Sequence, residues 1–366
     1  MKSSHALVPF QVIRLYRGGQ VMDETIRKLF GAEISQQLSN IFNTYKKGEN
    51  DKNNNQAEIK TISEIRLRAN KPLIIRTHNS EYAINEKGKL INLIAFPIDK
   101  GMSNISMRAK FYSPSMAEIS ETIERISQYS FYAFESELQQ GYITLPGGHR
   151  VGVVGQAIIE KENSKNGFLQ IVQAWRHISG LNIRIAHSVI GCANEVLPHI
   201  FVREKLLHTL IISPPGFGKT TLLRDIIRQI SDGSPTRKGL NVGLVDERSE
   251  VAGCFQGIAQ NDIGIRTDVM DGCPKALAMT MLLRGMSPDV IAVDEIGGEQ
   301  DAHAVDAVLN AGVKLLCTAH GSDVTDALVN PSLSPMLSRG IFERFIVLGK
   351  AGRISGIFDG GGQSVI

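Results

Sequence analysis

The sequence predicts an α/β protein of two domains, with a mostly parallel sheet in the second half of the chain and a smaller α+β domain before it. Three observations support this prediction. The chain has 366 residues, which is about the length of two domains. Its second half alternates short apolar runs with helical patterns, as βα units do. A glycine-rich turn joins the first of these apolar runs to the helix that follows.

Composition excludes several classes of protein. Forty basic and 37 acidic residues leave a net charge of +3, so bulk charge gives no argument for nucleic acid or an anionic membrane. No apolar stretch approaches the roughly 18 residues that cross a bilayer, and no signal peptide is visible. We therefore expect a cytoplasmic protein. The chain has four cysteines, Cys192, Cys254, Cys273 and Cys317, and no two of them form a CxxC pair. This spacing argues against a zinc ribbon or a disulfide framework.

The chain is expected to begin with a tail over residues 1–21, because a helical pattern opens only at Met22. Either Met1 or Met22 could be the true start. The α+β domain is predicted over 22–195. Within it, the stretch 46–60 has almost no aliphatic residues, so it cannot bury enough apolar surface to offset its ordering entropy, and we predict a flexible insert there.

Strands and helices mix in this first domain without strict alternation, which indicates an α+β arrangement. A helix is predicted over 116–129, and two starts are compatible with it. Either Ser113 precedes Pro114 at the first helical position, or Ser115 forms a capping box with Glu118. The other predicted elements are strands at 65–68 and 73–75, a helix at 131–140, a hairpin of 142–145 with 150–154, a polar excursion at 160–167 and a strand at 181–186.

The second domain, 196–366, has regular βα alternation. Its apolar runs are short and continuous, which is typical of parallel strands that are covered on both faces. The predicted strands are 206–212, 242–245, 290–293, 313–316 and 345–348.

The strongest motif is a strand, a glycine loop and a helix in succession, the context of a phosphate-binding loop. Backbone N–H groups of such a loop surround the phosphates of a nucleotide. We expect ATP as the ligand, with Lys219 reaching the β- and γ-phosphates and Thr220 holding Mg²⁺. The usual pattern opens with glycine, whose place Ser213 takes here. The loop residues are Ser213, Pro214, Pro215, Gly216, Phe217, Gly218, Lys219, Thr220 and Thr221.

Two carboxylates end the apolar strand at 290–293. Asp294 is predicted to bind Mg²⁺, and Glu295 is predicted to act as the general base that polarises water for attack on the γ-phosphate.

Two further strand ends carry polar side chains, and ligands of open α/β sheets bind beyond the carboxyl ends of the strands. Glu247 follows one of these strands and either positions the attacking water or is a solvated charge. His320 follows the other and is either structural or a γ-phosphate sensor.

Phosphoryl transfer gains from a cation that meets the γ-phosphate, often from a neighbouring subunit. Arg266 and Arg284 are the candidates in this domain. Arg224 and Arg228, on the helix after the phosphate loop, are predicted to lie on a solvated face.

Several segments together resemble the stage III sporulation protein AA family of secretion-type AAA+ ATPases, which are related to type IV secretion and pilus-retraction motors. They are ISPPGFGKTTLLRDI, VDERSEVAGCFQGIAQNDIGIRTDVMDGCPKA, MSPDVIAVDEIGG and TAHG, with ISEIRLRANKPL and SFYAFESELQQGYITLPGGHRVGVVGQA in the first domain. The resemblance implies a RecA-like P-loop NTPase domain, an Asp box at Asp246-Glu247 and a His box around His320.

The resemblance also implies a function. The family hydrolyses ATP to ADP and phosphate for export or channel assembly between mother cell and forespore during endospore formation. A homo-oligomer, in the form of a hexameric ring, is expected to act peripherally on membrane-embedded subunits of a sporulation secretion complex.

Two alternatives differ in class. One is a nucleic-acid-binding ATPase, because plastid and cyanobacterial relatives add a single-strand-binding module. The stretch after Lys350 is too short for such a module, so nucleic acid is not an expected partner. The other is a nucleotide-gated structural subunit with little turnover, against which the intact Glu295 argues.

Overall fold

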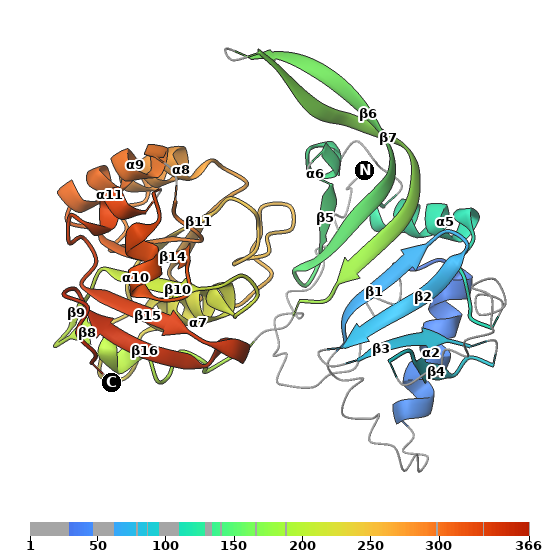
Figure 1. Cartoon of the computed structure of the whole chain (residues 1–366), viewed down its shortest axis with the longest axis horizontal. Helices are drawn as coiled ribbons and strands as arrows, with labels where there is room; N and C mark the ends of the chain where they lie inside the picture. Colours follow the sequence, from blue (N-terminus) through green and yellow to red (C-terminus); the bar gives the residue numbers. More distant parts are fainter. Residues whose placement is uncertain are drawn as a thin grey trace, which may run out of the picture. The chain divides into compact units, whose positions relative to one another are not determined.

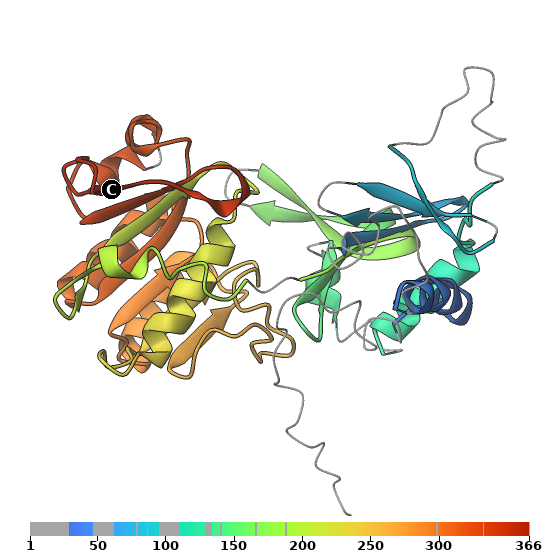
Figure 2. The same ribbon diagram turned by 90° about the horizontal axis from the view of Figure 1, so that it is seen from below.

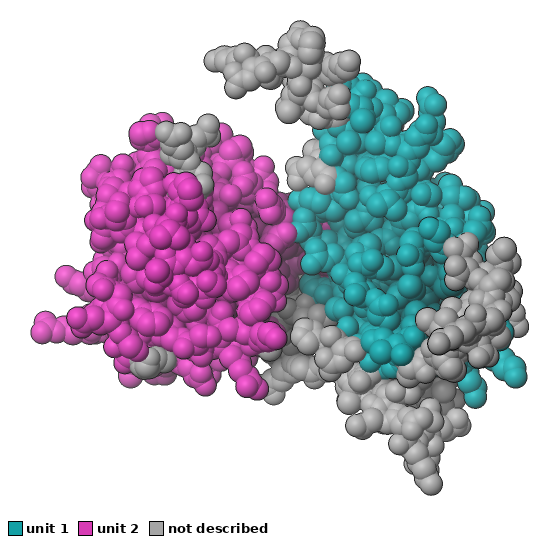
Figure 3. All heavy atoms as spheres, in the orientation of Figure 1, with its two compact units in different colours: residues 1–143, 150–186 teal, residues 144–149, 187–366 magenta. Residues whose placement is uncertain are grey.

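The chain forms two compact units (Figures 1 and 3), residues Met1–Ile143 with Arg150–Ala186, and Thr144–His149 with His187–Ile366. The main break lies between Ala186 and His187, earlier than the predicted boundary at 195/196. The computed structural model describes residues 29–46, 62–77, 80–85, 87–94, 110–128, 134–139, 141–164, 167–186, 189–297, 299–331 and 333–365. Three predicted features lie outside these ranges: the tail at 1–21, the helix start at Met22 and the insert at 46–60, of which only Lys46 is described.

The first unit is built on a seven-stranded sheet in the order β4-β3-β2-β1-β7-β6-β5, of which only Thr144, Leu145 and His149 are assigned to the second unit. Helices α2 and α5 lie on one face of this sheet (Figure 2). The elements are α2 (Ala32–Lys46), β1 (Ile62–Arg68), β2 (Lys71–Thr77), β3 (Glu81–Ile84), β4 (Leu90–Asn92), α5 (Met116–Ile126), α6 (Glu135–Gln139), β5 (Tyr142–Leu145), β6 (His149–Ser164) and β7 (Gly167–Arg184).

Helix α5 begins with the capping box rather than with proline. Ser115 Oγ accepts a hydrogen bond from the backbone N–H of Glu118, and the Glu118 carboxylate accepts one from the N–H of Ser115 at 2.8 Å. The helix ends at Ile126, before the predicted end, and Gln128 two residues later has a left-handed backbone with φ of 50°.

The described residues of the polar excursion predicted at 160–167 belong to strands, since β6 runs to Ser164 and β7 begins at Gly167. Strands β6 and β7 pair antiparallel from Arg150↔Arg184 to Ser164↔Gly167, so the polar segment forms the far part of one long hairpin (Figure 1). Backbone hydrogen bonding between strands does not require apolar side chains, which is why the pairing continues where the hydrophobic pattern stops.

The second unit contains a sheet in the order β12-β11-β13-β14-β10-β15-β16, parallel except for the edge strand β16. The predicted strands are present as β10 (Thr209–Ser213), β11 (Val242–Asp246), β13 (Val290–Val293), β14 (Lys314–His320) and β15 (Arg344–Leu348). Residues Lys205–Leu206 form β9, which pairs with β8 (Phe201–Val202) instead of extending β10. Strands β12 (Thr267–Asp271) and β16 (Ile354–Asp359) were not predicted.

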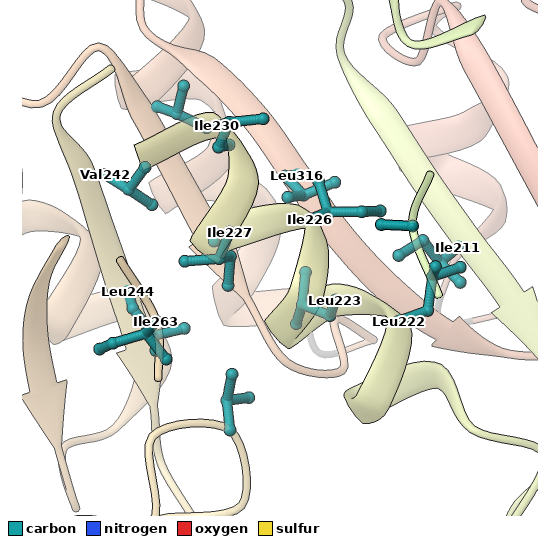
Figure 4. Close-up of a cluster of buried hydrophobic side chains, with 14 of the residues drawn as sticks. Ile211, Leu222, Leu223, Ile226, Ile227, Ile230, Val242, Leu244, Ile263 and Leu316 are labelled. Atoms are coloured by element: carbon teal, nitrogen blue, oxygen red, sulfur yellow. The ribbon is translucent and has the colours of Figure 1, made fainter. Parts of the chain in front are cut away.

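Alternate residues of the central strands enter two separate cores, as both faces of a parallel sheet require. On one face, helix α7 (Lys219–Asp232) packs its apolar stripe against Ile211, Leu244 and Leu316 (Figure 4). The core on the opposite face contains side chains of α8 (Lys275–Gly285) and α9 (Glu299–Asn310). The second unit is therefore an α/β domain whose parallel strands all present their carboxyl ends at one edge.

Candidate nucleotide site

The phosphate loop connects β10 to α7 at that edge. Gly216 and Gly218 have φ of 77° and 94°, a left-handed conformation that glycine adopts without strain. Gly218 is the N-cap of α7 and no side chain caps the helix, so its first N–H groups remain available to an anion. Ser213 is the fully buried last residue of β10, paired with His320 in parallel register. The motif's first position is thus extended strand here, and glycine is not needed there.

The ammonium group of Lys219 folds back onto its own loop. Nζ donates to the carbonyl oxygens of Ser213 at 2.9 Å and Pro214 at 3.3 Å, and it lies 3.0 Å from Nδ1 of His320. Burial lowers the pKa of Lys219, and the carboxylates of Glu295 and Asp294 oppose this shift. The cation is therefore held at the loop by neutral acceptors, which phosphate oxygens could replace.

His320 connects Lys219 to the end of β13. An ammonium has three protons and no acceptor, so the Lys219 contact makes Nδ1 of His320 an acceptor and places the ring proton at Nε2. Nε2 lies 3.2 Å from Oε2 of Glu295. The structure thus brings Lys219, His320 and Glu295 into one continuous chain of polar contacts.

Asp294 lies against the first turn of α7. Thr220 Oγ1 donates to Asp294 Oδ2 at 3.3 Å, and Thr318 Oγ1 donates to Oδ1 at 3.0 Å. Burial, together with the nearby carboxylate of Asp246, raises the pKa of Asp294 to about 6. A buried carboxylate beside a threonine hydroxyl, at a site where negative charge is disfavoured, fits an oxygen-preferring divalent cation. Among the described residues no cluster of three His, Cys, Asp or Glu side chains could bind a metal alone.

The end of β11 brings a second group of carboxylates to the same edge. Asp246 is buried and accepts backbone hydrogen bonds from Glu250, Val251 and Ala252, so it shapes the loop that follows its strand. Burial raises its pKa, and these hydrogen bonds oppose the rise. Glu247 forms an ion pair with Lys275 at 2.9 Å. One small pocket is lined by Asp246, Glu247, Arg248, Glu250, Lys275, Asp294 and Glu295.

A neighbouring cavity of about 170 Å³ opens beside the His320–Glu295 pair. Glu295 and Glu247, the two candidates for the residue that activates water, thus both line pockets at this edge of the sheet. The cavity is lined by Glu295, Ile296, Gly297, His320, Asn330 and Leu333.

The two candidate arginines lie on the opposite side of their domain, near the amino ends of the parallel strands. Arg266 precedes β12, and its Nη1 donates to the carbonyl oxygens of Ser231 and Asp232 at the end of α7. Arg284 is exposed in the last turn of α8. Neither residue faces the phosphate loop of its own chain, so a role for either in catalysis would require a second copy.

The prediction of a solvated face for Arg224 and Arg228 is wrong. Arg224 donates to the carbonyl oxygens of Val251 at 2.6 Å and Glu250 at 2.7 Å, and Arg228 pairs with Asp225 at 2.8 Å. The partners of Arg224 lie in a loop far along the chain, where no helical pattern could reveal them. The sequence did not predict that Arg224 and Lys275 contribute to this edge, and it predicted no separate role for Thr318 within the polar strand end.

Comparison with known proteins places the chain among sporulation proteins. A family model described as sporulation stage III, protein AA, matches residues 36–365. Stage III sporulation protein AA of Bacillus subtilis (strain 168) is 44% identical over 244 residues, 66% of this chain and 76% of that protein. Protein SEEDLING PLASTID DEVELOPMENT 1 of Arabidopsis thaliana is 32% identical over 162 residues, 44% of this chain and 22% of that protein.

Solved structures of ATPases are similar at low sequence identity. The ATPase DotB of Legionella pneumophila has 16% identity and a TM-score of 0.46, with 78% of this chain and 72% of that chain covered. The pilus retraction motor PilT, solved with bound ADP, has 15% identity and a TM-score of 0.45, with 78% and 74% covered.

Proposed function

The chain belongs to the sporulation stage III protein AA family, and we propose that it is an ATPase that powers export or channel assembly at the mother cell–forespore boundary. One observation carries the enzymatic part of this proposal. The phosphate-loop hydroxyl of Thr220 lies 3.3 Å from Asp294, beside the Lys219–His320–Glu295 chain of contacts. A phosphate binder, a cation site and a base therefore lie at one edge of the sheet.

Binding of the phosphates is assigned to the loop and to Lys219. The left-handed glycines Gly216 and Gly218 leave the backbone N–H groups and the start of α7 free to surround an anion. Lys219 would exchange its contacts with Ser213 and Pro214 for phosphate oxygens. This exchange adds charge-assisted hydrogen bonds in place of neutral ones, and charge-assisted bonds are roughly twice as strong.

Mg²⁺ would be held by Thr220 and Asp294, together with phosphate oxygens of the nucleotide. When bound, Mg²⁺ would neutralise the negative charge that develops on the phosphates. Burial raises the pKa of Asp294 more than its hydrogen bonds with Thr318 and Thr220 lower it, so a cation at this position would favour its ionised form.

Activation of the attacking water is assigned to Glu295. Its carboxylate borders the cavity beside His320, and its Oε2 lies 3.2 Å from Nε2 of that ring. Glu247 is the alternative base, but its ion pair with Lys275 would have to be broken or rearranged before its carboxylate could take up a proton.

The partners proposed for this activity are a second copy of the chain, in a hexameric ring, and membrane-embedded subunits of a sporulation secretion complex. Within the described ranges, no helix is long and apolar enough to span a membrane. The charge of +3 is too small to favour nucleic acid as a partner.

The direct test is phosphate release from ATP by the purified chain with Mg²⁺ and with EDTA, alongside sedimentation with membranes from sporulating and vegetative cells. We expect Mg²⁺-dependent release, and sedimentation with the sporulating membranes alone. Absence of hydrolysis under all conditions, with nucleotide still bound, would instead favour a nucleotide-gated structural subunit.

A further inference from the structure

Thr318 of β14 contacts three consecutive residues at the end of β13. Regular pairing of these strands ends at Val293↔Cys317. Beyond it, Thr318 Oγ1 donates to Asp294 Oδ1 at 3.0 Å and accepts from the backbone N–H of Glu295 at 2.9 Å. The carbonyl oxygen of Thr318 accepts from the N–H of Ile296, also at 2.9 Å. One residue thus binds the whole turn that carries both carboxylates.

The turn needs this support because Glu295 has a left-handed backbone, with φ of 62°. A residue other than glycine in this region costs on the order of 1–3 kcal/mol and persists only where its surroundings enforce it. The two backbone hydrogen bonds from Glu295 and Ile296 to Thr318 provide that enforcement. The conformation in turn decides the direction in which the Glu295 side chain leaves the chain.

The hydroxyl of Thr318 has no substitute at its position. Its side chain is 0% exposed, so water does not compete for its two partners. Its single proton is used by Asp294, which leaves its lone pairs for the N–H of Glu295. Residues two apart on a strand point to the same side, so Thr318 and His320 approach Glu295 together, one at its backbone and the other at its carboxylate.

We propose that Thr318 is a positioning residue that sets the magnesium-binding carboxylate Asp294 and the base Glu295 at the same time. This inference rests on the proposed ATPase function of the site. Thr318 itself touches no phosphate. Its contribution is to keep the two carboxylates in a fixed mutual arrangement, so that a cation and a water can be engaged together.

The test compares Thr318→Val, which keeps the shape and removes the hydroxyl, with Thr318→Ser, which keeps the hydroxyl. We expect the valine variant to lower kcat by about 10- to 100-fold, the range that a misplaced catalytic group produces, with KM for ATP within about twofold. The serine variant should retain most of the wild-type kcat. If the valine variant does not fold, Thr318→Ala against Thr318→Ser gives the same comparison, because these two differ by one oxygen atom.

Thr209→Val is the matched control. Thr209 is also a fully buried threonine of this sheet, in the neighbouring strand β10, and its hydroxyl donates to the carbonyl oxygen of Leu207 at the opposite strand end. It should therefore lose stability as Thr318→Val does but keep its kcat.

A second measurement does not depend on turnover. A fluorescent, non-hydrolysable ATP analogue should bind Thr318→Val and the wild type equally in EDTA. The increase in affinity that Mg²⁺ adds should be smaller by at least about fivefold in the variant, because a displaced Asp294 loses part of a charge-assisted contact.

The inference is overturned if Thr318→Val retains wild-type kcat and the full Mg²⁺ increment, or if Thr209→Val loses kcat to the same extent. Loss of kcat in Thr318→Ser equal to that in Thr318→Ala would also overturn it. An inactive wild type that binds nucleotide would refute the proposed ATPase function, and the Mg²⁺ increment would then still decide the role of Thr318.

Discussion

Nζ of Lys219 and Nδ1 of His320 lie 3.0 Å apart, although the two residues are separated by 101 positions in the chain. The contact exists because β10 and β14 are parallel neighbours that end together, with Ser213 paired to His320. The phosphate-loop lysine is thereby joined to Glu295, because Nε2 of His320 lies 3.2 Å from Oε2 of Glu295.

The first prediction is that Lys219→Ala abolishes ATP turnover while the fold survives. The phosphates lose their cation, but alanine is the best helix former at this first position of α7. Phosphate release measures the loss, and the melting temperature should stay within a few degrees of wild type. Lys205→Ala, which removes an exposed lysine of β9, serves as the control. Near-normal hydrolysis by Lys219→Ala would show that the phosphate-loop assignment is wrong.

The second prediction concerns Glu295→Gln, which keeps the acceptor for His320 and removes the base. Loss of general-base help should lower kcat by about 10²–10⁴-fold, while equilibrium binding of ATP persists. Glu247→Gln is the matched variant and should have a much smaller effect. The reverse pattern would move the role of base to Glu247, and lost binding in Glu295→Gln would indicate a structural carboxylate.

The third prediction is that Asp294→Asn stabilises the protein and impairs Mg²⁺-dependent turnover. The folded-state pKa of about 6 lies above the ordinary value of 3.8, so the native state binds this proton more tightly than the unfolded chain does. The carboxylate is therefore increasingly destabilising as the pH rises from about 4 to about 6, and fully so above that window. Asparagine removes this penalty, which is on the order of 2 kcal/mol.

Melting curves of Asp294→Asn and wild type from about pH 4 to pH 8 check this prediction. The variant should melt higher at pH 8, and the gap should close toward pH 4. A gap that does not change with pH would contradict the burial of an ionised Asp294 as its cause.

Much of this edge could be predicted because its signals are local. Stretches of about fifteen residues or fewer are enough to predict the phosphate loop, the strand before Asp294 and the amphipathic helix after the loop. Glu247 and His320 could be added to the site because ligands of such sheets bind at the carboxyl ends of the strands. What was missed depends on contacts across the chain. Strand β12 reads TDVMD, a half-polar sequence that only pairing with β11 identifies as a strand.

The wrong prediction for Arg224 has the same cause. In the sequence, Arg224 occupies a polar position of an amphipathic helix. Only the fold brings the carbonyl groups of residues 250–251 within reach of its guanidinium. Thr318 belongs to the polar strand end that includes His320, but no role of its own was predicted for it, because a threonine inside an apolar strand is ordinary on β-propensity alone.

The fourth prediction follows from that loop. Arg224→Ala should destabilise the second unit by about 2 kcal/mol, since the variant removes charge-assisted hydrogen bonds to the carbonyl groups of Val251 and Glu250. Arg224→Lys keeps the charge but not the planar arrangement of donors, and should recover only part of the loss. Urea unfolding measures both. Equal stability of Arg224→Ala and wild type would show that the other contacts of the loop, from Asp246 and Asn261, hold it without Arg224.

The last prediction is that hydrolysis depends on assembly. The carboxylates and Lys219 meet at one edge of the sheet, whereas Arg266 and Arg284 lie toward the other edge of the same domain, so only a neighbouring copy could present either arginine to the γ-phosphate. An arginine supplied in this way is worth about 10³–10⁵ in turnover in well-studied systems. Specific activity should therefore rise steeply with protein concentration, in step with the mass measured by light scattering.

Arg284 gives the cleaner test of the two arginines, because Arg266 also binds the last carbonyl groups of α7. Arg284→Ala should lower kcat at saturating protein concentration far more than it lowers ATP affinity, with no change in melting temperature. Arg266→Ala should lower both kcat and stability. Arg203→Ala, an exposed arginine between β8 and β9, should change neither. A specific activity independent of concentration, in a sample that light scattering shows to be monomeric, would mean that each chain carries a self-sufficient site.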